Sequence, residues 1–70
     1  MMTTTDRLTA LDQIEKGIMR DLDNRPNFTL TRTQLFNRIA DYLDDAPHAT
    51  TDDIDAIYST ALIIDLPIRD

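Results

Sequence analysis

The chain has 70 residues, 41% of them hydrophobic, with a formal net charge of −6 and no cysteine. This length fits one small domain with a marginal core, and without cysteine neither a disulfide nor a thiolate metal site can stabilise it. No stretch approaches the roughly 18 apolar residues of a membrane-spanning helix, and the first residues lack the apolar core of a signal peptide, so we expect a cytoplasmic protein.

The charge is distributed unevenly along the chain. Residues 1–38 contain six bases and five acids, whereas residues 39–70 contain one base and eight acids. This balance disfavours direct binding to nucleic acid, since such binding depends on basic side chains that neutralise phosphates.

A first amphipathic helix is predicted over residues 6–23, because apolar residues recur there at helical spacing. One of Thr4, Thr5 or Asp6 is expected to cap it. Pro26 ends it, since the residue before a proline avoids helical dihedral angles. The predicted apolar stripe consists of Leu8, Leu11, Ile14, Ile18, Met19 and Leu22.

Glu15, the only glutamate in the chain, falls inside that stripe. A buried, unpaired carboxylate is costly, so Glu15 should pair with an arginine, with Arg38 as the expected partner, or reach a tyrosine hydroxyl or an interface. The alternative is a helix rotated enough to leave Glu15 at a solvated edge.

The central helix is predicted over residues 32–44. Thr31 and Gln34 have the spacing of a capping box, and Leu30 and Leu35 have the spacing of a hydrophobic staple around the same helix start. Its predicted apolar face is broad and consists of Leu35, Phe36, Ile39, Ala40, Tyr42 and Leu43.

A third helix is predicted over residues 52–64, with Thr50 or Thr51 as its cap. Asp65 would interrupt the apolar face and Pro67 follows, so the helix should end near Ile64 and leave an irregular tail. The inward face is expected to consist of Ile54, Ile57, Tyr58, Ala61 and Leu62.

Three amphipathic helices with short connections predict an all-α three-helix bundle that forms one domain over residues 1–70, with residues 1–5 and 66–70 flexible or irregular. Ile63, Leu66 and Ile68 lie outside the third helix's inward face. Three apolar residues on one terminal stretch of a small protein suggest a contact, so we expect a homodimer that forms through them.

Residues that could support catalysis or bind a cofactor are scarce. The only histidine, His48, lies in a loop, and Ser59 lies in the middle of a predicted helix with no sharp turn to expose it. Gly17 is the only glycine, so a phosphate-binding loop is excluded, and the sequence after Asp21 lacks the remaining ligands of a calcium loop. We therefore expect no enzymatic activity, no cofactor and no metal site.

An acidic cluster is the most informative feature of the sequence. It can be a solvated helix end followed by a helix start whose dipole favours acids, or a surface for a basic partner protein. Its members lie within fifteen residues around one predicted loop: Asp41, Asp44, Asp45, Asp52, Asp53 and Asp55.

The function expected from these features is protein–protein interaction. The protein would be a small acidic regulator or inhibitor, of the kind carried by phages and mobile elements, acting on a basic or nucleic-acid-binding partner protein. One alternative is a helix-turn-helix-like DNA-binding regulator that reads bases with the helix over residues 32–44, and a second is a structural or assembly subunit. The side chains available for base reading are Arg32, Thr33, Gln34, Asn37 and Arg38.

Overall fold

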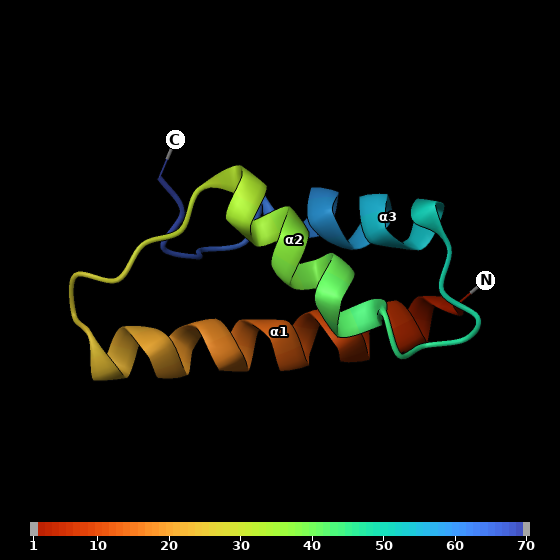
Figure 1. Cartoon of the computed structure of the whole chain (residues 1–70), viewed down its shortest axis with the longest axis horizontal. Helices are drawn as coiled ribbons and strands as arrows, with labels where there is room; N and C mark the ends of the chain where they lie inside the picture. The colour runs from red at the N-terminus through yellow and green to blue at the C-terminus, as the bar shows by residue number, and fades with distance from the viewer. Residues whose placement is uncertain (1, 70) are drawn as a thin grey trace.

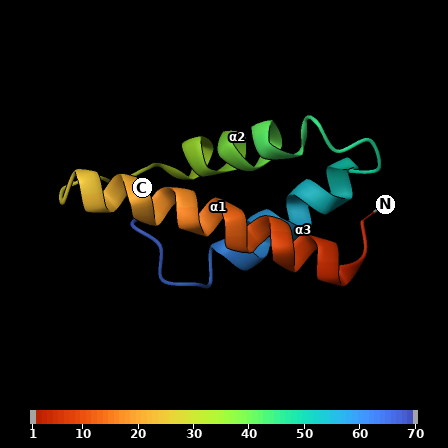
Figure 2. The same ribbon diagram turned by 90° about the horizontal axis from the view of Figure 1, so that it is seen from below.

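The computed structural model describes residues 2–69 and contains three helices, α1 (Thr4–Asn24), α2 (Arg32–Leu43) and α3 (Thr51–Ala61), each in contact with the other two (Figure 1). α1 runs the length of the molecule, with α2 and α3 packed against it and against each other (Figure 2). The predicted all-α three-helix architecture is confirmed. The predictions of flexibility for residues 1 and 70 lie outside the described residues.

α1 begins two residues earlier than predicted. Its cap is Thr3, whose backbone is extended and whose side-chain oxygen accepts a hydrogen bond from the Asp6 N–H at 3.0 Å. The prediction of a cap at positions 4–6 was therefore wrong, because the chain turns helical directly after Thr3. The buried residues of α1 are Ala10, Leu11, Ile14 and Ile18.

The buried face of α1 is also rotated relative to the predicted stripe. Leu8 is 58% exposed and Met19 is more than one-third exposed, whereas Ala10, absent from the predicted stripe, is buried. The rotation follows from α1 packing against two helices, since the residues between α2 and α3 become the centre of its contact face.

α2 begins where the capping pattern predicts. The Gln34 N–H donates to Thr31 Oγ1 at 3.1 Å, and the Thr31 N–H donates to Gln34 Oε1 at 2.8 Å, which completes the capping box. Leu30 and Leu35, which flank this start, are both buried. The cap therefore fixes α2 at the point where it enters the core.

Replacing Thr31 by alanine should destabilise the protein by about 1 kcal/mol, because the N–H that it caps would lose its partner. Gln34→Ala should lower the free energy of unfolding by less than Thr31→Ala does. Thr33→Ala, an exposed residue in the same helical turn, is the matched control and should change the free energy of unfolding by at most about 0.5 kcal/mol. Urea unfolding measures all three, and equal effects for Thr31→Ala and Thr33→Ala would contradict this account of the helix start.

α3 ends at Ala61, three residues before its predicted end. The chain then turns, and residues 66–69 return to the segment before α2 (Figure 1). There the Leu30 N–H donates to the Pro67 carbonyl at 3.0 Å, and the Arg69 N–H donates to the Leu30 carbonyl at 2.9 Å. A longer α3 would carry the chain away from Leu30, so this return explains the early end.

Candidate functional site

Five carboxylates lie exposed at one end of the bundle. The last turn of α2, the connection after it and the start of α3 meet there, at the end where the N-terminus also lies (Figure 1). None of the five has an ion-pair partner within residues 2–69. We call this group the acidic end, and its members are Asp41, Asp44, Asp45, Asp52 and Asp55.

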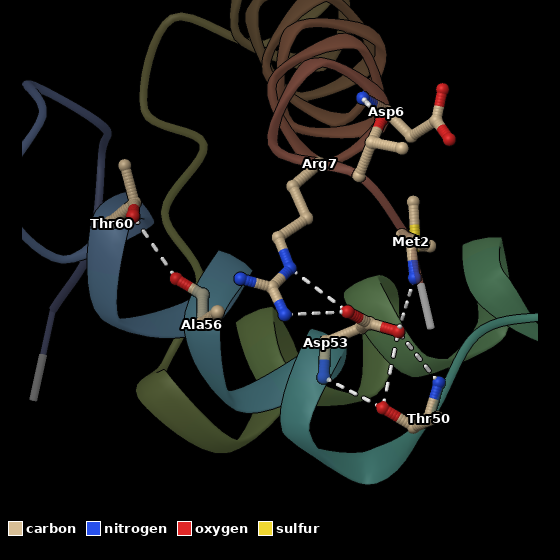
Figure 3. Close-up of polar contacts among 8 residues, drawn as sticks. Met2, Asp6, Arg7, Thr50, Asp53, Ala56 and Thr60 are labelled. Carbon is tan, nitrogen blue, oxygen red and sulfur yellow. Dashed lines mark hydrogen bonds and ion pairs between the residues drawn. The ribbon is translucent and has the colours of Figure 1, made fainter.

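Asp53, the sixth predicted member of the cluster, is not part of this surface. Its exposed fraction is 0%, and its side chain points back into the fold (Figure 3). The prediction that Asp53 contacts a partner protein is therefore corrected. The residue is a structural carboxylate, fully enclosed where α3 begins.

Asp53 first serves as half of the capping box of α3. Its Oδ2 accepts a hydrogen bond from the Thr50 N–H at 2.9 Å and from Thr50 Oγ1 at 3.1 Å, while its own N–H donates to Thr50 Oγ1 at 3.3 Å. The same Oδ2 accepts from the Met2 N–H at 3.1 Å. One carboxylate therefore holds both the helix start and the N-terminal segment.

The other oxygen of Asp53 binds α1. Arg7 Nε donates to Asp53 Oδ1 at 2.8 Å, and Arg7 Nη2 lies 2.8 Å from the same oxygen (Figure 3). Burial raises the pKa of Asp53, but the hydrogen bonds from Met2, Thr50 and Arg7 outweigh burial and hold the pKa well below its usual range. Asp53 is thus ionised and links α1 to α3.

Sequence reasoning missed the role of Arg7. A local signal was present for half of the arrangement, because Thr50 and Asp53 have the spacing of a capping box with an acid in the fourth position. The pairing with Arg7, 46 residues away, follows only from the way that α1 crosses α3.

The acids at the end of α2 oppose the field of their own helix. Asp41 and Asp44 lie in its last turn and at its C-terminal cap, and that turn contains no base. A helix C-terminus carries partial negative charge, so acids there destabilise the helix, whereas Asp52 in the first turn of α3 is favoured. The helix dipole therefore explains why acids are favoured at the start of α3, but it does not explain the acids at the end of α2.

The opposite end of the bundle has a different character. Arg38 forms an ion pair with Asp21, and the guanidinium of Arg25 lies 4.8 Å from the centre of the Phe28 ring. The hydrogen bond from Arg38, opposed by partial burial, lowers the pKa of Asp21. The predicted ion pair between Glu15 and Arg38 was wrong, because Arg38 pairs with Asp21 instead. Glu15 is half-buried.

These contacts bear on the side chains considered for reading DNA bases. Arg38 is engaged with Asp21, and the side-chain oxygen of Gln34 is engaged in the capping box of α2. Both groups would have to leave contacts that hold the fold in order to contact a base. Arg32, Thr33 and Asn37 are exposed on α2.

The three residues expected to mediate self-association do not form one exposed surface. Ile63 is 83% exposed, but Leu66 and Ile68 pack against the hydrophobic core. The backbone hydrogen bonds on both sides of Ile68 fix this segment beside Leu30. Only Ile63 is available in this structure for the contact that the sequence suggested.

Within residues 2–69 there is no group of three or more potential metal-ligating acids or histidines, and no helix long and apolar enough to cross a membrane. No family model matches the chain, and comparisons with curated proteins and with solved structures also found no match.

Proposed function

We propose that this protein is a non-enzymatic binding protein whose acidic end engages a basic surface on a partner protein. The observation that carries the proposal is the group of five exposed carboxylates at one end of the bundle, none of which has an ion-pair partner among residues 2–69. Three of them, Asp41, Asp44 and Asp45, lie at or just beyond the C-terminal end of α2, where acids destabilise the helix. Side chains that oppose local stability are expected mainly at functional or strained sites.

The distribution of bases supports the same proposal. Four of the seven bases, Arg20, Arg25, Arg32 and Arg69, lie toward the end of the molecule opposite the acidic end (Figure 1). Arg7, near the acidic end, is paired with the buried Asp53. A molecule polarised in this way turns its acidic end toward a positively charged surface as the two approach. Such steering raises the association rate and suppresses encounters in wrong orientations.

A basic surface on a nucleic-acid-binding protein is the partner that this chemistry fits best. A cluster of carboxylates can occupy the arginines and lysines that otherwise contact phosphates. The protein would then act as a regulator or inhibitor by competing with nucleic acid for that surface.

Two variants of equal net charge test the proposal. The acidic-end variant carries Asp44→Asn, Asp45→Asn and Asp55→Asn, and the control variant carries Asp12→Asn, Asp23→Asn and Asp65→Asn, which are exposed elsewhere. In affinity capture from the native host, the parent and the control variant should retain the same partner, and the acidic-end variant should lose it. Equal retention by both variants would contradict the proposal.

We also propose that Ile63 mediates weak self-association, since an 83% exposed isoleucine follows α3 on a chain with a small core. Sedimentation equilibrium at micromolar concentration should show a dimer for the parent and a monomer for Ile63→Asp. Leu8→Asp adds the same charge at an exposed leucine of α1 and should leave the dimer intact. A monomeric parent would contradict this proposal and would leave the acidic end unaffected.

A further inference from the structure

A hollow of about 300 Å³ opens beside the acidic end, between the first half of α1, the end of α2 and the connection that follows. Its lining is largely apolar and includes Met2, Ala10, Tyr42, Leu43, Ala46 and Ala49. This volume lies at the lower limit of small-ligand sites, so it suits one apolar side chain rather than a large cofactor.

Tyr42 lines this hollow and is exposed, whereas the other three aromatic residues of the chain are half-buried. It is 46% exposed, although the helical spacing predicted it as part of the inward face. Tyrosine is enriched among the residues that dominate binding energy, because its ring buries a large apolar area while its hydroxyl stays solvated.

Charge determines which occupant the hollow suits. Asp6 lies in its lining, and Asp41 and Asp44 flank Tyr42 and Leu43 in the chain. Asp45 directly precedes the lining residue Ala46. The hollow is therefore an apolar depression with one carboxylate, that of Asp6, in its lining and three more on residues that adjoin lining residues in the chain. Lysine or arginine in a bound segment would be attracted to these carboxylates, whereas an acidic or neutral segment would not.

We propose that the hollow receives the apolar side chain of a short peptide segment in which lysine or arginine stands on both sides of that residue. This inference rests on the proposed function and narrows it, because it replaces a broad basic surface by a basic segment with one apolar anchor. The anchor supplies buried apolar area, and the flanking bases pair with the acidic end.

Two synthetic peptides with blocked termini test the inference, Lys-Arg-Leu-Arg-Lys and Lys-Arg-Ser-Arg-Lys, titrated into the full chain labelled with ¹⁵N. The leucine peptide should shift the amide signals of Ala10, of residues 42–46 and of His48 and Ala49, and it should bind roughly tenfold more tightly than the serine peptide. Tyr42→Ser should remove most of that difference. Met19→Ser, at an exposed methionine of α1 outside the hollow, should leave it unchanged.

A third peptide and the charge variants separate the two parts of the inference. Ser-Ser-Leu-Ser-Ser should bind more weakly than the leucine peptide with bases, and the acidic-end variant should weaken binding of that peptide more than the control variant does. Equal affinity for the leucine and serine peptides would overturn the apolar anchor while the proposed function stood. Equal affinity for the two leucine peptides, or no binding of any peptide to the folded protein, would overturn the inference as a whole.

Discussion

Asp53→Asn should lower the melting temperature of the protein by about 10 °C or more. The amide that replaces one oxygen is a donor, so it would face Arg7 or the N–H groups of Met2 and Thr50, which are donors too. The substitution also removes the charge that pairs with Arg7. The enclosure of Asp53 makes the loss large, because no water can replace the missing acceptor.

Asp55→Asn is the matched control, since Asp55 lies on the same helix and is exposed. Its melting temperature should differ from that of the parent by no more than about 3 °C. The melting temperature of Arg7→Leu should lie between those of Asp53→Asn and Asp55→Asn, because Asp53 would still accept hydrogen bonds from the backbone N–H groups that it caps. If Asp53→Asn melts within the range of Asp55→Asn, the buried carboxylate does not link the helices.

Acid should remove the stabilisation that Asp53 supplies. The pKa of Asp53 is lowered in the folded state, so the unfolded chain, where an aspartate has a pKa of about 3.9, takes up the proton first as the pH falls. The stabilisation is complete above that value and is lost progressively as the pH falls below about 4 toward the folded pKa. The ion pair of Asp21 with Arg38 contributes in the same direction.

Urea unfolding of the parent and of Asp53→Asn at several pH values measures this effect. The difference between their free energies of unfolding should be constant from pH 7 to pH 5 and should shrink below about pH 4. A difference that persists undiminished at pH 2.5 would show that the carboxylate's charge is not what Asp53 contributes.

Local sequence signals predicted the helices well where the responsible contacts are local. The start of α2 was predicted at the observed residue because Thr31 and Gln34 satisfy each other within one turn. The start of α3 was predicted to within one residue for the same reason, through Thr50. Capping depends on residues three apart, so the sequence displays it directly.

Features that depend on distant segments were not predictable in this way. α3 ends early because Ile68 pairs with Leu30, and no periodicity within residues 51–64 indicates that contact. Asp53 was grouped with its acidic neighbours because its partner Arg7 is remote in the chain. The acidic end itself was predictable, since exposed aspartates near a helix end need no distant partner.

The association rate of the captured partner protein, measured at low and at high salt, tests the proposed role of the acidic end most directly. At low salt the acidic-end variant should associate roughly tenfold more slowly than the parent, and the control variant of equal net charge should stay close to the parent. Near 1 M salt, where the screening length is about 3 Å, the three rates should converge. Equal rates for the two variants at low salt would show that the position of these carboxylates does not matter, and that the acidic end is only a solvated surface.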